Sequence, residues 1–283
     1  MCERTSLSLT QNDGTPEGIC RTGYEWLNDG KFEMAAHIFH QVLKIRPNFV
    51  EAHLGLASSM MPGEDYRMIL GRFHDWLSPV RYMEIGVEDG ESMALARTSF
   101  RPVGIDPSPK IRFDLGPNAR LFAVTSDDFF STMDVQELLG GTLDLAFIDG
   151  LHLFEQTLRD FINVEKYSNP GSVILIHDTL PLDCITSRRE RTTQFWSGDV
   201  WKIVPCLKAS RKDLTVINIA TSPTGLLAVT NLNPESEVLE KNYDQILDLF
   251  LPLQFEDISE RNLLSDVTAN DWKLIRERLR IEK

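Results

Sequence analysis

The sequence predicts an α/β fold with a doubly wound, mostly parallel sheet, because short apolar runs alternate with helical patterns over about 150 residues. The first five runs are continuously apolar, which is typical of strands buried on both faces. The runs predict a seven-stranded sheet, with strands at Val80–Ile85, Pro102–Ile105, Leu121–Val124, Leu143–Ile148, Val173–Ile176, Leu214–Ile219 and Leu226–Thr230. Helices are predicted between them at Ser92–Thr98, Asp127–Leu139, Glu155–Val164 and Val200–Ala209.

Composition narrows the class of protein. The 283 residues are 42% hydrophobic and 25% charged, which excludes a disordered or fibrous chain. A net charge of −13 makes the chain a poor binder of nucleic acid backbone. No apolar run approaches the roughly 20 residues that span a bilayer, and Met1–Asn12 lacks a signal-peptide pattern. The four scattered cysteines, among them Cys2, indicate reduced thiols, so we expect a cytoplasmic protein without nucleic acid or membrane partners.

Residues 1–75 are expected to form an α-helical extension in front of the sheet. The segment from Pro16 to about Phe49 resembles one tetratricopeptide repeat, with a small residue at Gly23 and Pro47 at the exit, and residues 50–57 look like the start of a second. One or two repeats cannot bury their own apolar faces. The extension is therefore expected to cap the next domain or to form a dimer contact; a peptide-binding groove is the alternative.

Residues 76–233 comprise the predicted sheet domain, and residues 234–283 a helical, acidic C-terminal tail. The tail carries 12 acidic and 7 basic side chains, and its apolar residues recur at helical intervals. The extension and the tail have few amphipathic faces of their own. We expect them to pack onto the sheet domain or to mediate a homodimer or higher homo-oligomer.

The first candidate binding motif is an apolar strand that ends in Glu84 and is followed by Gly86, Gly90 and a helix start at Ser92. Glycines there let a ligand approach the backbone, and the helix start offers free N–H groups. Glu88 stands where a dinucleotide fingerprint has its middle glycine, and its carboxylate would repel a pyrophosphate. The motif favours a ligand without phosphates that has a cationic amino-acid end.

Two further strand ends carry polar residues. Asp106 ends the second strand and suits the two hydroxyls of a ribose; alternatively it caps the turn before Pro107. Ser126 and Asp127 follow the third strand beside a helix start, where Asp127 or its neighbour Asp128 has the alternative role of a helix N-cap.

Together with Asp144–His152 and Val173–Thr179, these motifs resemble class I S-adenosylmethionine (SAM)-dependent methyltransferases, and the resemblance covers about residues 78–232. It implies a Rossmann-like sheet with central strand order 3-2-1-4-5 and a small-molecule acceptor. The implied SAM-binding residues are Glu84, Gly86, Gly90, Ser92, Asp106, Ser126, Asp127 and Asp149.

The two later segments are similar to the branch of small-molecule and sugar O-methyltransferases, many of which depend on a divalent cation. The resemblance implies that Asp149, His177 and Asp178 hold Mg²⁺ or another divalent cation and that His152 is a general base, with Asp149 also catalytic. Those relatives carry an oxygen ligand where His177 stands, and Mg²⁺ prefers oxygen, so the identity and the presence of a metal stay open. His152 has the alternative role of a helix-capping or core histidine.

A segment of about 20 residues, Thr179–Gly198, interrupts the alternation beyond the fifth strand. Its place predicts a lid or a binding surface over the acceptor site. Its arginines, Arg188, Arg189 and Arg191, either hold an anionic acceptor or form salt bridges between subunits. The segment also contains Phe195. Trp196, together with Trp201 and Lys202 just beyond the segment, is a candidate for the lid or for the core.

The sequence thus predicts a SAM-dependent methyltransferase, a transferase acting on a small-molecule hydroxyl, with a divalent cation as a second expected cofactor. Two alternatives come from other classes of protein. One is a nicotinamide-dependent oxidoreductase on a similar sheet, against which Glu88 counts. The other is a non-catalytic scaffold that acts through its helical repeats.

Overall fold

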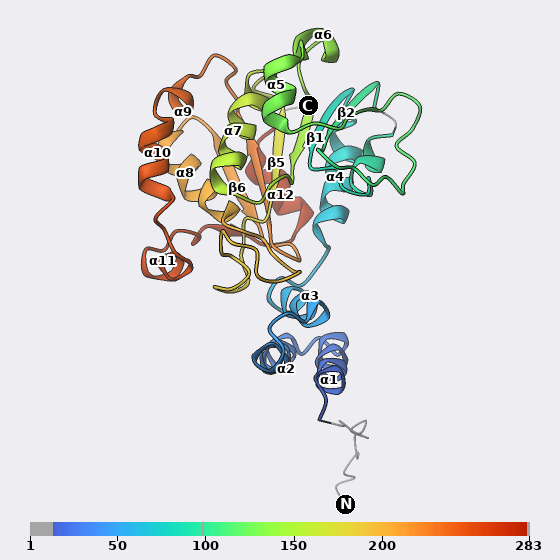
Figure 1. Ribbon diagram of the computed structural model, residues 1–283, viewed down its shortest axis with the longest axis vertical. Coiled ribbons are helices and arrows are strands. Elements are labelled where there is room, and N and C mark those ends of the chain that lie inside the picture. The colour runs from blue at the N-terminus through green and yellow to red at the C-terminus, as the bar shows by residue number, and fades with distance from the viewer. Residues whose placement is uncertain (1–13, 98, 282–283) are drawn as a thin grey trace, which may run out of the picture.

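The computed structural model describes residues 14–97 and 99–281 (Figure 1). Expectations that involve Met1–Asn12, Cys2 or Thr98 lie outside these ranges. Within them, the sheet has eight strands in the order β3-β2-β1-β4-β5-β7-β6-β8. The strands are β1 Arg81–Ile85, β2 Arg101–Ile105, β3 Arg120–Phe122, β4 Leu145–Ile148, β5 Val173–His177, β6 Thr215–Ile219, β7 Leu226–Thr230 and β8 Val267–Thr268.

The predicted order of the first five strands is confirmed, and these strands run parallel to their neighbours. β7 is antiparallel to both β5 and β6. The predicted count of seven is one short, because β8 pairs with the edge of β6. A strand of two residues leaves no apolar run for a sequence pattern to detect.

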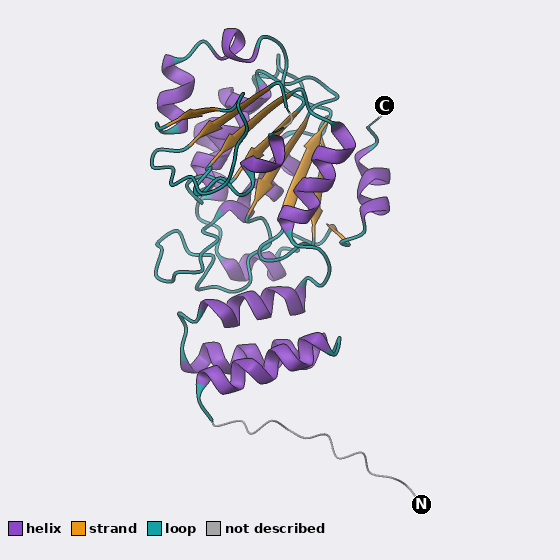
Figure 2. Cartoon of the chain, turned by 90° about the vertical axis from the view of Figure 1, so that its right-hand side faces the viewer, coloured by secondary structure: helices purple, strands orange, loops and turns teal. Residues whose placement is uncertain are grey.

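Helices cover both faces of the sheet, as Figure 2 shows. Side chains of a strand alternate between faces, so Met83 and Ile85 belong to one core cluster and Tyr82 to the other. The first face packs against α5 Ser126–Thr132, α6 Val135–Leu139, α7 Phe154–Glu165, α8 Ile203–Ser210, α9 Val238–Lys241 and α10 Tyr243–Phe250. The second packs against α4 Tyr66–Leu77, the 3-10 helix Met93–Ala96 and α12 Trp272–Leu279.

Two predicted helices differ from the observed ones. The stretch expected as one helix, Asp127–Leu139, is divided into α5 and α6, because Met133 is extended and the Asp134 side chain accepts a hydrogen bond from the Glu137 N–H, 2.9 Å away, and so caps α6. The region of Ser92–Thr98 contains only one turn of 3-10 helix within the described residues.

The N-terminal extension projects from the sheet domain as α1 Pro16–Asn28, α2 Phe32–Ile45 and α3 Val50–Met60 (Figure 1). These helices pack around Phe39. A Cβ on Gly23 would lie 2.7 Å from the Phe39 ring, and one on Gly55 would lie 2.2 Å from it, so both positions require glycine. The fourth helix, α4, packs on the sheet, so the part that stands apart ends at α3.

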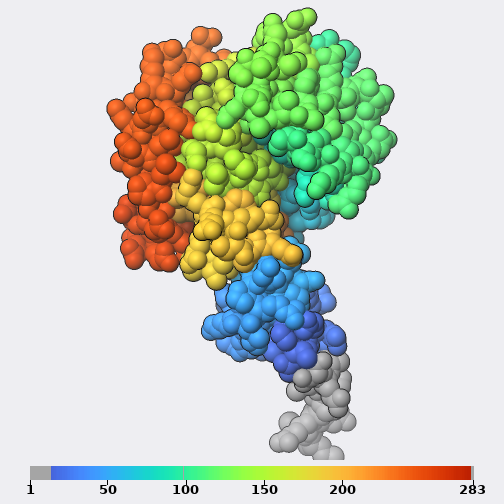
Figure 3. Space-filling view, in the orientation of Figure 1, coloured from blue at the N-terminus to red at the C-terminus, as the bar shows by residue number. Residues whose placement is uncertain are grey.

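The segment 179–198 lies between the extension and the sheet domain, in the gold region above the blue helices of Figure 3. Ala57 and Met61 of the extension pack against Leu182 and Phe195 of this segment. The C-terminal tail also packs on the domain, since Leu239 and Ile246 join one core cluster and α12 joins the other. Its short helix α11, Phe255–Glu260, buries no residue. Among the described residues, no helix is both long and apolar enough to cross a membrane.

Candidate active site

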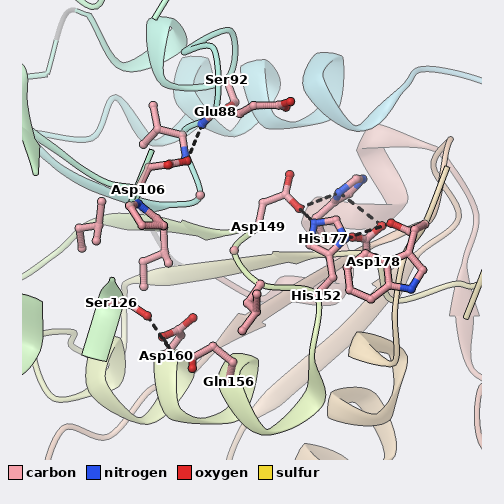
Figure 4. A pocket seen from close by; sticks show the side chains of 18 of the residues that line it. Glu88, Ser92, Asp106, Ser126, Asp149, His152, Gln156, Asp160, His177 and Asp178 are labelled. Carbon is pink, nitrogen blue, oxygen red and sulfur yellow. Dashed lines mark hydrogen bonds and ion pairs between the residues drawn. The ribbon is translucent and has the colours of Figure 1, made fainter. Parts of the chain in front are cut away.

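A cavity of about 680 Å³ opens at the carboxyl ends of β1, β2, β4 and β5 (Figure 4). This volume is in the range of small-molecule sites. In Figure 4, Asp149, His152, His177 and Asp178 form one group, and Asp106 and Ser126 lie apart from it. Of the predicted site residues, those that line the cavity are Gly86, Ser92, Asp106, Ser126, Asp127, Asp149, His152, His177 and Asp178.

The loop after β1 requires its glycines. Gly86 has a φ of +88°, and a Cβ there would lie 2.0 Å from the Asp149 carbonyl oxygen. Gly90 also has a φ of +88°, and its Cβ would lie 2.9 Å from Leu115. Gly86 therefore lets the end of β4 approach the loop, whereas Gly90 shapes the loop without lining the cavity.

Asp106 fixes the same loop to the end of β2. Its Oδ2 accepts hydrogen bonds from the backbone N–H groups of Val87, at 3.0 Å, and Glu88, at 2.8 Å. Its Oδ1 accepts from the Ser108 N–H at 2.7 Å, so the predicted turn cap is also present. A carboxylate has about four acceptor positions, which leaves capacity for a ligand hydroxyl.

Glu84 is fully buried beneath the loop and does not line the cavity. It accepts hydrogen bonds from the Tyr82 hydroxyl and, at 2.7 Å, from the Ser92 hydroxyl. Burial raises the pKa of Glu84 to about 8, although both hydrogen bonds oppose this shift. The predicted contact between Glu84 and a cofactor is thus replaced here by support of the loop through Ser92.

A polar cluster occupies the side of the cavity near α5 and α7. The Gln156 amide Nε2 lies 3.0 Å from the Ser126 hydroxyl, 3.0 Å from Asp160 and 3.2 Å from Asp127. Burial raises the pKa of Asp160 to about 6. The helix N-cap is Thr125, whose hydroxyl accepts from a backbone N–H 3.1 Å away, so the alternative capping role of Asp127 is wrong.

Sequence reasoning missed Gln156 and Asp160, which also line the cavity. Their spacing of four residues on a helix places two polar groups on one face, a signal that could have found them. Tyr66 and Thr224 line it too. They come from elements far away in the sequence, and no local pattern marks them.

The group of Asp149, His152, His177 and Asp178 lies at the ends of β4 and β5 (Figure 4). His152 Nε2 lies 3.4 Å from Asp149 Oδ1, and His152 Nδ1 lies 2.9 Å from Asp178 Oδ2. Among the described residues, Asp149, His152 and Asp178 each offer a ligand atom within 4.8 Å of the other two. The structure therefore brings His152 together with the two carboxylates, where the sequence analysis expected His177 as the metal ligand.

His177 has a different place. Its Nδ1 lies 3.1 Å from Asp149 Oδ1, and its Nε2 lies 3.3 Å from the Thr224 hydroxyl. The Tyr66 ring stacks on it, with ring centroids 4.0 Å apart. His177 therefore contacts Asp149 from outside the cluster of Asp149, His152 and Asp178.

Backbone strain is concentrated in this cavity. Glu88, His152 and Asp178 are non-glycine residues with φ values of 48°, 52° and 63°, and all three line it. A Cβ on Gly198 would lie 1.9 Å from the His152 carbonyl oxygen, so segment 179–198 packs tightly against this backbone. Such strain persists where the surrounding structure imposes it, commonly at functional sites.

The two carboxylates also set the charge of His152. Burial alone would lower the pKa of His152, but Asp178 and Asp149 together raise it well above its usual range. Burial would raise the pKa of Asp149, yet His177 and His152 hold it well below its usual range. The neighbouring carboxylates therefore favour the protonated imidazole of His152, and its role as a general base stays a prediction.

Comparison with known proteins was informative for the central segment. Residues 83–179 match the family model described as a methyltransferase domain. This segment contains every predicted site residue, from Glu84 to Asp178. No curated protein matches the chain.

Several solved structures are similar to it. One is the O-methyltransferase TomG from Streptomyces achromogenes, involved in tomaymycin synthesis, in complex with SAM: 18% identity, 59% of this chain and 79% of that chain covered, TM-score 0.43. Another is an O-methyltransferase from Bacillus cereus in complex with SAH, with 17% identity, 70% of this chain and 99% of that chain covered, and a TM-score of 0.45. A third is cofactor-bound Rv0187 from MTB, with 18% identity, 64% of this chain and 88% of that chain covered, and a TM-score of 0.47.

The family match thus makes the central segment of this chain similar to a methyltransferase domain. Its α/β sheet and the cavity at the carboxyl ends of the strands agree with that class, because ligands of open α/β sheets bind at this edge.

Proposed function

We propose that the protein is a SAM-dependent methyltransferase that methylates a hydroxyl oxygen of a small molecule with the assistance of a divalent cation. The observation that carries this proposal is one cavity lined both by the loop after β1 with Asp106 and by the cluster Asp149, His152 and Asp178. A cofactor and an acceptor would therefore meet in one place.

The residues near β1, β2 and α5 fit SAM. Asp106 has free acceptor capacity for a ribose hydroxyl, and the loop at Gly86 and Glu88 offers carboxylate and backbone groups to the amino-acid end. Ser126 and Gln156 offer hydroxyl and amide groups to the adenine edge. SAM, when bound, supplies a methyl group already activated on a sulfonium.

The cluster fits a divalent cation by its donor set. Asp178 Oδ2 is buried, and its contact among the described residues is the 2.9 Å ion pair with His152 Nδ1; two carboxylates and an imidazole converge there. Mixed oxygen and nitrogen donors suit a transition-metal ion such as Mn²⁺ or Fe²⁺ better than Mg²⁺. A cation there, when bound, lowers the pKa of an acceptor hydroxyl.

The chain's own residues would orient this cluster. His177 holds the Asp149 carboxylate at 3.1 Å, and partners of this kind fix the direction of a ligand oxygen. The Trp196 ring stacks on His152 with centroids 5.4 Å apart, and the Trp196 carbonyl lies 3.1 Å from its Nδ1. A cation replaces the proton of His152, because an imidazole ligand has to be neutral. We therefore propose His152 as a ligand, with Asp149 as both ligand and catalytic residue.

Isothermal titration of the full chain with SAM and with NAD⁺, each with and without a chelator, tests the proposed function. We expect SAM to bind and NAD⁺ not to bind, and we expect chelation to leave SAM affinity nearly unchanged while abolishing turnover. Binding of NAD⁺ alone would favour the oxidoreductase, and binding of neither would favour a scaffold.

We further propose that the enzyme is cytoplasmic and works as a homodimer or higher homo-oligomer through its helical extension. Apolar side chains stay exposed there, notably Met34 at 49% and Ile45 at 60%. Removing residues 1–75 also removes part of α4, so a truncation that ends before α4 is preferable. A lower number of subunits in the truncated protein, measured by light scattering, supports this proposal, and an unchanged number of subunits contradicts it.

A further inference from the structure

The segment 179–198 forms a fixed wall of the cavity. Arg189 forms ion pairs with Glu155, at 2.6 Å, and with Asp199, at 2.8 Å. The Gln194 N–H donates to the side chain of Asn48, between α2 and α3, at 2.7 Å. These contacts tie the segment to α7 on one side and to the helical extension on the other.

The wall presents aromatic faces beside the cluster. Trp196 stacks on His152, and Phe195 stacks on His53 of α3 with centroids 5.0 Å apart. Tyr66 of α4, which is far from this segment in the sequence, stacks on His177. All three aromatic residues line the cavity, so an acceptor next to the cluster meets apolar ring surfaces.

One cation on this wall has no acidic partner among the described residues. Arg191 lines the cavity, and its guanidinium donates to the carbonyl oxygens of Thr193, at 3.4 Å, and Gln194, at 2.9 Å. Arg67, the other arginine that lines the cavity, is paired with Glu91 at 2.9 Å. The charge of Arg191 is therefore not compensated, and a guanidinium with five N–H donors keeps several for a ligand.

We propose that the acceptor is an anion, a hydroxylated small molecule whose carboxylate or phosphate pairs with Arg191 and whose body contacts the Tyr66 and Trp196 rings. This inference rests on the proposed function. A planar guanidinium binds carboxylate and phosphate oxygens in pairs. An arginine at the cavity without an acidic partner in the described part of the chain selects such a molecule against neutral ones.

The structure gives different surroundings to the three arginines whose roles the sequence left open. Arg189 pairs with Glu155 and Asp199 of its own chain, so its charge is already compensated without an anion or a second subunit. Arg188 lines a separate cavity near α11 and does not line the first one. Arg188→Gln is therefore a matched control for Arg191→Gln, in the same segment and with the same loss of charge.

The test is isothermal titration with a matched pair of probes, 4-hydroxybenzoate and its neutral analogue 4-hydroxybenzamide, and with 4-hydroxyphenyl phosphate. We expect an anionic probe to bind at least about 10-fold more tightly than the amide, because hydrogen bonds to a charged group are stronger than those to a neutral one. Arg191→Gln should abolish this preference, and Arg188→Gln should retain it. The carboxylate and phosphate arms identify the favoured anion.

Equal affinities for the anionic and neutral probes, no binding of either anion, or the same loss in both variants would overturn the inference. The titrations are run with and without SAH. If the wild-type protein does not bind SAH, the proposed function is contradicted. If it binds SAH but shows no preference for the anionic probes, only the inference about the acceptor is contradicted.

Discussion

Asp160→Asn is expected to stabilise the protein at neutral pH. Asp160 on α7 is only 1% exposed, and its carboxyl group shares the Gln156 amide with Ser126. Burial raises its pKa from 3.8 to about 6, because the low-dielectric surroundings disfavour the charge. At pH 7 the folded protein has to hold a carboxylate that water would solvate better. Asparagine keeps the acceptor oxygen without the charge.

The magnitude and the sign follow from the difference in pKa. The folded state keeps its proton up to about pH 6, whereas the unfolded chain loses it near 3.8. Stability therefore falls as pH rises between these values, by about 2 pKa units, or roughly 3 kcal/mol, because one unit corresponds to 1.36 kcal/mol. The variant should exceed the wild type by about this free energy of unfolding at pH 7 and by nearly nothing below about pH 4.

Urea unfolding of both proteins at a series of pH values from 4 to 8 measures this difference. Asp127→Asn is the control, since Asp127 is half-exposed and paired with Arg159 at 3.2 Å. Removing that exposed ion pair should change stability by less than about 1 kcal/mol at any pH. A difference between Asp160→Asn and the wild type that does not vary with pH would refute the reasoning.

Three further outcomes are expected. Asp106→Ala should weaken SAM binding by at least about 10-fold in calorimetry, through loss of a charge-assisted hydrogen bond of about 1.5–3 kcal/mol and of the loop contacts; unchanged affinity would remove Asp106 from the site. Asp149→Ala should abolish methyl transfer and its cation dependence while SAM still binds, and a chelated enzyme with full activity would contradict the metal role. Gly55→Ala should destabilise the protein by about 1–3 kcal/mol in urea unfolding, because its methyl group would overlap the Phe39 ring. Gly71→Ala in α4, whose Cβ has no atom closer than 3.9 Å, should instead be neutral or stabilise by up to about 1 kcal/mol, and equal losses in both variants would contradict the packing argument.

Much of the fold was predictable because its signals are local. The apolar runs of β1, β2, β4, β5 and β7 follow from burial in the sheet, and the glycine positions after β1 from neighbours in the chain, whereas the edge strand β3 is largely exposed. The division between α5 and α6 was missed because the capping by Asp134 depends on one side chain, and β8 because it is two residues long.

The site was predictable only in part, since its parts depend on tertiary packing. Strand ends place Asp149 and Asp178 at one edge, as parallel strand order requires. Which histidine joins them depends on the strained turn at His152 and on the contact with Gly198, neither of which has a sequence pattern. Likewise Tyr66 reaches the cavity only because α4 packs on the sheet.

The most direct test of the central claim is a crystal structure of the full chain grown with SAH and Mn²⁺, with anomalous differences recorded for manganese. The account predicts SAH with its ribose on Asp106, and one manganese peak bound by Asp149, His152 and Asp178 in the same cavity. Density for SAH elsewhere, or a manganese site that uses His177 in place of His152, would contradict it.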